Sequence, residues 1–134
     1  MFDEISPQAA YEALKADEKA QLIDCRTQAE WAYVGTPDLS PIDKQLACLE
    51  WQSIEGRPNA EFVDQIATHF EPDTPIYIIC RSGARSASAC AALAQRGFTT
   101  LFNVTGGFEG DPNGDGHRGS VNGWKHAGLP WRQS

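Results

Sequence analysis

The stretch PIYIICRSGARSASACAALAQRG, residues 75–97, decides the fold of this chain. It begins with a run of β-branched and aromatic residues, Ile76–Ile79, which is typical of a strand covered on both faces. The run ends at Cys80, and small and basic residues follow. An alanine-rich helix pattern then extends to Gly97, a residue suited to the left-handed position after a helix. The pattern predicts a strand, a loop and a helix, with Cys80 at the carboxyl end of the strand.

The Cys80 thiol is the first candidate for chemistry in this stretch. A tight loop that leads into a helix directs several backbone N–H groups toward one point, and the helix dipole adds partial positive charge there. Arg81 and Arg85 add full charges. We therefore expect the pKa of Cys80 to fall from ~8.5 toward 7 or below. The alternative is a buried structural cysteine that ends a core strand, which is a common place for cysteine.

The size and charge of the chain narrow the classes of function. Its 134 residues suit one domain, residues 1–134, with a single core. The net charge of −7 and the lack of a basic stripe disfavour a nucleic-acid partner. No apolar stretch approaches the ~20 residues of a membrane helix, and the start lacks a secretory signal, so we expect a cytoplasmic protein without a membrane partner. The four cysteines form no C-x-x-C pair, so we expect free thiols and no metal site.

Helix and strand patterns alternate along the rest of the chain. Such alternation predicts an α/β fold, with an open, mostly parallel central sheet of about five strands and helices on both faces. Sheets of this kind place ligands at the carboxyl ends of their strands. Further helices are expected at residues 7–16, at 59–70 with Asn59 as N-cap, and at 120–128, and further strands at residues 21–25, 46–50 and 99–104.

Several of these segments resemble the rhodanese (thiosulfate sulfurtransferase) family. They are the loop after Cys80, the strand end LIDCR at residues 22–26 with Thr27, Glu30 and Trp31 after it, and the turn Gly106-Gly107. The resemblance covers about residues 5–132 and implies a rhodanese-like fold. It also implies that Cys80 is a nucleophile that accepts a sulfane sulfur as a persulfide. The implied active-site loop is Arg81, Ser82, Gly83, Ala84, Arg85 and Ser86, supported by Asp24, Arg26, Gly106 and Gly107.

The number of residues between Cys80 and Arg85 indicates which class of substrate the loop suits. Cys80 and Arg85 form the pattern C-x4-R, whereas protein tyrosine phosphatases carry C-x5-R. A longer ring of amides can surround a phosphate, and a shorter ring suits one sulfur and its attached anion. The loop therefore favours sulfur over phosphate.

The resemblance implies a sulfurtransferase that needs no cofactor. The Cys80 thiolate attacks thiosulfate or a persulfide donor, and a thiol or cyanide then removes the sulfur. Arg81 and Arg85 bind the oxyanion of the donor. The expected partners are a small sulfur-donor anion and a thiol acceptor, which can be a protein thiol, and the expected assembly is a monomer or a weak homodimer. Two alternatives stay open: a sulfur-carrier or regulatory rhodanese-like module with little turnover, and a phosphatase or arsenate reductase.

Several features keep more than one interpretation. Asp24 either bonds turn amides and pairs with Arg26, or braces the active loop. Cys25 either packs in the core or resolves a Cys80 persulfide as a disulfide, which needs Cα atoms within ~7 Å. Residues 111–116 match the start of a calcium-binding EF-hand loop, but Asn122 replaces the bidentate Glu, so an ordinary loop or a lid is the alternative. Residues 36–58 lack the family's Gly-His-Ile-Pro-Gly-Ala segment, which leaves their course open.

Overall fold

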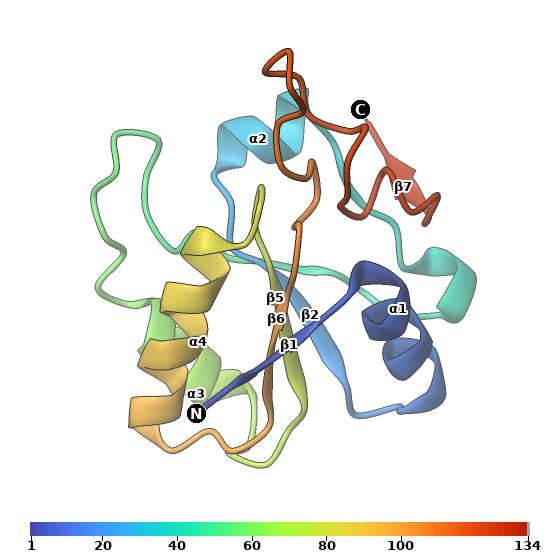
Figure 1. The fold of residues 1–134 in the computed structure, drawn as a ribbon. Coiled ribbons are helices and arrows are strands. Elements are labelled where there is room, and N and C mark those ends of the chain that lie inside the picture. Colours follow the sequence, from blue (N-terminus) through green and yellow to red (C-terminus); the bar gives the residue numbers. More distant parts are fainter. Residues whose placement is uncertain (134) are drawn as a thin grey trace.

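A five-stranded parallel sheet forms the centre of the molecule (Figure 1). The computed structural model describes residues 1–133. The strand order is β1-β6-β5-β2-β4, and all four neighbouring pairs are parallel. The predicted fold class is therefore confirmed. The strands are β1 Asp3–Ile5, β2 Gln21–Asp24, β4 Ala47–Cys48, β5 Ile76–Ile79 and β6 Leu101–Val104.

Helices cover both faces of this sheet, as Figure 1 shows. On one face, Ile76 and Ile78 of β5 pack in a core with α3 and α4. On the other face, Tyr77 and Ile79 pack with α1 and with the C-terminal segment around Trp124. All four residues of β5 are buried, which explains why its sequence is apolar without alternation. The helices are α1 Pro7–Ala16, α2 Gln28–Tyr33, α3 Phe62–His69 and α4 Ala84–Arg96, with a short 3₁₀ helix, η1, at Ser40–Ile42.

Local signals set the ends of two helices where the sequence predicts them. Ser6 caps α1, because its hydroxyl oxygen accepts a hydrogen bond from the amide of Ala9 at 3.2 Å, and Pro7 occupies the first turn. Gly97 ends α4 at a φ of 109°, a conformation that favours glycine.

A second, two-stranded antiparallel sheet joins the middle of the chain to its C-terminal end. It consists of β3 (Thr36–Pro37) and β7 (Trp131–Arg132). Between these strands and the central sheet, Trp124 is fully buried and its indole N–H donates to the carbonyl of Pro130 at 2.7 Å. The tail is therefore packed against the domain. Within residues 1–133, no helix has both the length and the apolar character that crossing a bilayer requires.

The structure corrects three predictions of secondary structure. Residues 120–128 form turns and not a helix, because Gly123 and Gly128 adopt positive φ angles of 104° and 77°. The helix expected from Asn59 begins at Phe62. Asn59 lies in the turn before it, where its side-chain Oδ1 accepts a hydrogen bond from the Glu61 amide and its Nδ2 donates to the carbonyl of Glu50. The strand expected at residues 46–50 is only two residues long, and β1 was not predicted at all.

Candidate active site

The loop after β5 surrounds the sulfur of Cys80 with hydrogen-bond donors. The backbone N–H groups of Gly83 and Ser86 donate to Cys80 Sγ at 3.1 and 3.3 Å. Gly83 precedes α4 at a φ of 116°, and this left-handed conformation turns the chain sharply into the helix. The Ser86 hydroxyl also lies 3.1 Å from Sγ. Cys80 thus faces the start of α4, as the sequence predicts, and its residue surface is only 1% exposed.

These donors stabilise the charged form of the sulfur. The neighbouring Cys25 thiol is the largest influence on this pKa and lowers it, and burial opposes it. The hydroxyl and amide of Ser86 and the amide of Gly83 then add to the lowering. Together they lower the pKa of Cys80 to about 5. Cys80 is therefore a thiolate at neutral pH. The loop amides are among the causes, as the sequence predicted, but the Cys25 thiol and the Ser86 hydroxyl were not predicted, and neither arginine is among the causes.

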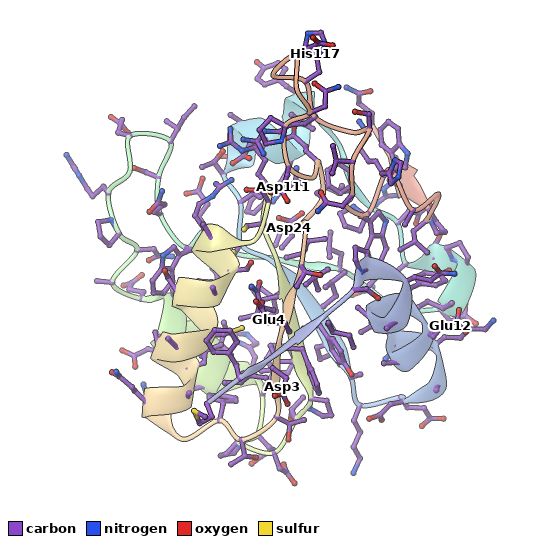
Figure 2. The ribbon with its side chains drawn as sticks, viewed as in Figure 1. Asp3, Glu4, Glu12, Asp24, Asp111 and His117 are labelled. Atoms are coloured by element: carbon purple, nitrogen blue, oxygen red, sulfur yellow. The ribbon has the colours of Figure 1, made fainter. Side chains whose placement is uncertain are left out.

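A buried polar chain, which the sequence analysis did not predict, connects Ser86 to the first strand. The Ser86 hydroxyl donates to Oδ1 of Asn103, a residue of β6 that is only 4% exposed. Asn103 Nδ2 donates to Glu4 Oε2 at 2.7 Å and to the carbonyl of Gly83 at 3.2 Å. Figure 2 labels Glu4 on β1. An asparagine at an inward position of a buried strand is the one signal that could have indicated this chain, since buried amides need partners.

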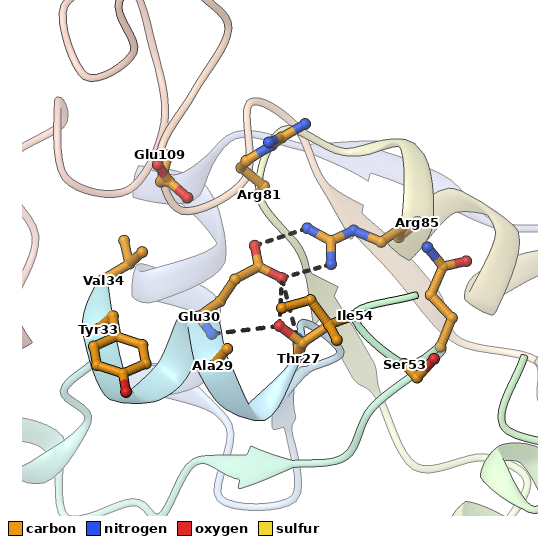
Figure 3. A pocket seen from close by; sticks show the side chains of 11 residues that line it. Thr27, Ala29, Glu30, Tyr33, Val34, Ser53, Ile54, Arg81, Arg85 and Glu109 are labelled. Atoms are coloured by element: carbon orange, nitrogen blue, oxygen red, sulfur yellow. Dashed lines mark hydrogen bonds and ion pairs between the residues drawn. The ribbon is translucent and has the colours of Figure 1, made fainter. Parts of the chain in front are cut away.

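Arg85 is held by a carboxylate from a different helix. Its Nη1 and Nη2 atoms donate to Glu30 Oε1 and Oε2 at 2.7 and 2.9 Å (Figure 3). Glu30 in turn forms a capping box with Thr27 at the start of α2. Glu30 therefore fixes the guanidinium of Arg85, which the sequence had assigned to binding a donor oxyanion.

A pocket of about 580 Å³ opens beside the loop. Arg81, Arg85, Glu30 and Glu109 contribute its charged lining, and Figure 3 shows Arg81 and Glu109 on the side away from α2. Arg81 is exposed, so its guanidinium can reach a small anion in the pocket. Cys80 is not among the lining residues. The pocket thus adjoins the loop without reaching the buried sulfur.

Asp24 and Arg26 form a fully buried ion pair at the end of β2. Arg26 Nη2 lies 2.7 Å from Asp24 Oδ2, and the Arg26 amide donates to Asp24 Oδ1. The direct contacts of Asp24 are therefore a turn amide and Arg26, the first of the two interpretations of this residue. The pair reaches the loop indirectly. The Arg26 guanidinium carbon lies 4.4 Å from the centre of the Phe108 ring, and the Phe108 amide donates to the carbonyl of Cys80 at 2.7 Å.

The Gly106-Gly107 turn lies directly against the backbone of the loop. A Cβ atom built on Gly107 would lie 2.4 Å from the carbonyl oxygen of Cys80 and 2.5 Å from that of Arg81. After the turn, the amides of Glu109 and Gly110 both donate to the Arg81 carbonyl, at 3.0 and 3.1 Å. The turn therefore holds the start of the loop in place from the end of β6.

The remaining predicted features lie outside this site. All four cysteines are free thiols, as expected. In the tail loop, which has His117 near its tip (Figure 2), Asn113 Oδ1 accepts the amides of Asp115 and His117 and Asp111 Oδ2 accepts from Asn122. Among residues 1–133, no three Cys, His, Asp or Glu side chains are grouped as metal ligands.

Comparison with known proteins identifies the family of this chain. Residues 2–134 match the family model described as the STR4 middle domain. A Rhodanese-like domain-containing protein 4 of Arabidopsis thaliana is 27% identical over 94% of this chain, which spans 25% of that protein. The chain belongs to the rhodanese-like family.

Other similar proteins match most of this chain and most of their own length. A sulfurtransferase of Allochromatium vinosum is 29% identical over 97% of this chain and 94% of its own length. An uncharacterized protein of Rickettsia prowazekii is 36% identical over 92% of this chain and 91% of its own length. The crystal structure of Rv0390 from M. tuberculosis superposes with a TM-score of 0.92 at 38% identity, covering 100% of both chains.

Proposed function

We propose that this protein is a sulfurtransferase that carries a sulfane sulfur on Cys80. The observation on which this proposal rests is the set of hydrogen bonds from the Gly83 and Ser86 amides to Cys80 Sγ, with a pKa of about 5 for that thiol. A thiolate is the reactive form of cysteine in sulfur exchange. The relative named as a sulfurtransferase supports the same class of reaction.

The first half-reaction loads the sulfur. The Cys80 thiolate attacks the sulfane sulfur of thiosulfate or of a persulfide, the donor's S–S bond breaks, and sulfite or a thiolate leaves with the electron pair. The product is a Cys80 persulfide. Arg81, which lines the pocket and is exposed, stabilises the charge on the leaving oxyanion. No general base takes part, because Cys80 is already ionised at neutral pH.

The second half-reaction transfers the outer sulfur of the persulfide to an acceptor. A thiolate or cyanide attacks the outer sulfur, and the Cys80 thiolate leaves. A thiol of low pKa is a good leaving group in sulfur exchange, so the same hydrogen bonds that favour attack also favour release. Arg85 supplies a positive charge at a fixed place on the edge of the pocket, because Glu30 binds its guanidinium.

Substitution of the nucleophile tests the proposal. Cys80→Ser is expected to abolish transfer of sulfur from thiosulfate to cyanide. Wild-type protein treated with thiosulfate should gain the mass of one sulfur atom on the peptide that contains Cys80. Cys48→Ser, which changes an exposed cysteine on β4, is the matched control and should keep both properties. Transfer that persists in Cys80→Ser would disprove the proposal.

A sulfur carrier with little turnover is the second candidate. It is favoured by the burial of Cys80, which does not line the pocket, and by the engagement of Arg85 with Glu30. A carrier should load one equivalent of sulfur from a persulfide and release it to a protein thiol faster than to cyanide. Measuring the single loading step beside the steady-state rate separates the two functions, since an enzyme turns over many times with small acceptors.

A further inference from the structure

Cys25 and Cys80 occupy neighbouring positions on adjacent strands. β2 and β5 run parallel, with Asp24 opposite Ile79, and the Cys25 amide continues the ladder by donating to the Ile79 carbonyl at 3.0 Å. The two cysteines therefore form the next pair. Neighbouring strands lie about 4.8 Å apart, which is within the Cα separation of about 4.4–6.8 Å found in disulfides.

Both side chains point to the same face of the sheet. Cys25 and Cys80 belong to one core cluster, together with Ile23 and Ile78 two positions before them. The residues between, such as Ile79, belong to the core of the opposite face. The Cys25 thiol also lowers the pKa of the Cys80 thiol, as a close neighbour does. Cys25 therefore faces the Cys80 side chain from the sheet, whereas the amides of Gly83 and Ser86 approach its sulfur from the loop.

We propose that Cys25 is a second reacting thiol, which resolves the Cys80 persulfide inside the protein. This inference rests on the proposed function for its persulfide. Cys25 sulfur attacks the inner sulfur of Cys80, the bond between the inner and outer sulfur breaks, and the outer sulfur leaves with the electron pair and the Cys25 proton as hydrosulfide. A Cys25–Cys80 disulfide remains. The two cysteines are oxidised by two electrons and the sulfane sulfur is reduced by two, so the step needs no other reactant.

This step competes with the external acceptor and is the slower of the two. Cys25 is fully buried, and burial raises the pKa of its thiol well above the usual value. A protonated thiol attacks slowly, so an acceptor thiolate in solution takes the sulfur first when it is abundant. When no acceptor is present, Cys25 releases the sulfur as sulfide and leaves a disulfide that a dithiol reductant must reopen. The protein then converts thiosulfate to sulfite and sulfide.

The other two cysteines are not placed for this reaction. Cys48 is exposed on β4, on the side of β2 away from β5, and pairs with Asp24, so its side chain belongs to the opposite face from Cys25. Cys90 lies on α4 ten residues after Cys80, and a helix rises about 1.5 Å per residue. Cys48→Ser therefore provides a background that removes the exposed thiol without touching the pair.

The test measures the release of sulfide and the mass of the protein, both in the Cys48→Ser variant. Cys48→Ser protein is loaded with thiosulfate, freed of the excess under anaerobic conditions, and left without an acceptor. We expect the adduct to disappear, one equivalent of sulfide to emerge, and a peptide joined through Cys25 and Cys80 to form. Adding Cys25→Ser or Cys25→Ala should preserve the adduct and stop the release of sulfide. Circular dichroism checks that each variant is folded.

Two outcomes would overturn the inference. In the first, the sulfur adduct on Cys48→Ser protein persists and no sulfide appears. In the second, sulfide is released at the same rate after Cys25 is replaced. A second arm uses dithiodipyridine, which activates Cys80 without any sulfur donor. Cys25 should expel a second thiopyridone and give the same disulfide, and its failure to do so also overturns the inference. If no thiosulfate adduct forms but this arm succeeds, the proposed sulfur transfer fails while the reacting pair stands.

Discussion

The Ser86 hydroxyl has one hydrogen and three neighbours that can accept it. Cys80 Sγ lies at 3.1 Å and the carbonyl of Gly83 at 3.2 Å, and Asn103 Oδ1 is the third. Because the Asn103 amide group donates to Glu4 and to Gly83, its oxygen must face Ser86. When Cys80 is a thiol it donates to Ser86, whose hydrogen goes to Asn103. When Cys80 is a thiolate, the Ser86 hydrogen turns to the sulfur.

Ser86→Ala is expected to raise the pKa of Cys80 above its value of about 5. Hydrogen bonds to charged groups contribute about 1.5–3 kcal/mol and one pKa unit equals about 1.4 kcal/mol, so the rise should be roughly one to two units. The pH dependence of alkylation by iodoacetamide measures it. Ser88→Ala changes an exposed serine of the same helix and serves as control. An alkylation midpoint that does not move would show that the hydroxyl does not stabilise the thiolate.

At the scale of elements, the turn after β6 and the loop after β5 fit together without space for a side chain. Gly107 has a φ of 61°, and its Cβ would meet backbone atoms of Cys80 and Arg81. The sequence predicted this proximity through the resemblance of the Gly-Gly turn. Local patterns likewise predicted β5, α4 and α1, since each carries its own start and stop signals. The absence of a helix at residues 120–128 could not be predicted, because it depends partly on the close packing of Gly123 against Gly110, a contact that no local pattern indicates.

Gly107→Ala is expected to destabilise the fold and to displace the loop. Backbone atoms at 2.4–2.5 Å must move, and crowding of this kind typically costs about 1–3 kcal/mol. Urea denaturation gives the loss in unfolding free energy, and alkylation of Cys80 reports the change in the loop. Gly114→Ala is the matched control, since nothing lies within 4 Å of its Cβ. Equal stability of the two variants would contradict the close approach.

At the scale of the whole molecule, contacts between distant segments complete the site. Glu30 and Arg85 are 55 residues apart, and Glu4 and Asn103 are 99 apart. Neither pair could be predicted from the sequence, because no local pattern distinguishes a surface carboxylate from one that meets a partner from another element. The same reason hid β1, whose three residues include exposed Asp3 and Glu4 and which forms only by pairing with β6. The chain's own composition indicated the fold class but not these connections.

The Glu30–Arg85 pair should make global stability depend on acid. Burial alone would raise the pKa of Glu30, but hydrogen bonds from Arg85 and Thr27 outweigh it and lower the pKa from 4.5 to about 2. A lowered folded-state pKa contributes stability that is complete above pH 4.5 and is lost as the pH falls toward 2. The melting temperature of the wild type should therefore exceed that of Glu30→Gln at neutral pH. This difference should shrink as the pH falls from 4.5 toward 2.

Melting temperatures recorded from pH 7 to pH 2 by circular dichroism test this expectation. Asp64→Asn is the control, because Asp64 pairs with Arg96 where both side chains are largely exposed, and such pairs contribute little. A gap between wild type and Glu30→Gln that stays constant down to the lowest pH would contradict the assigned ionisation.

The edge strand β1 pairs with β6, and Glu4 on β1 precedes its partner Asn103 on β6 by 99 residues in the sequence. Pairing over such a span raises the contact order, and high contact order slows folding. During synthesis, Glu4 therefore reaches Asn103 only after β6 has emerged. The hydrogen-bonded chain from Ser86 through Asn103 to Glu4 is therefore completed only after β6 has been synthesised, later than the loop that it supports.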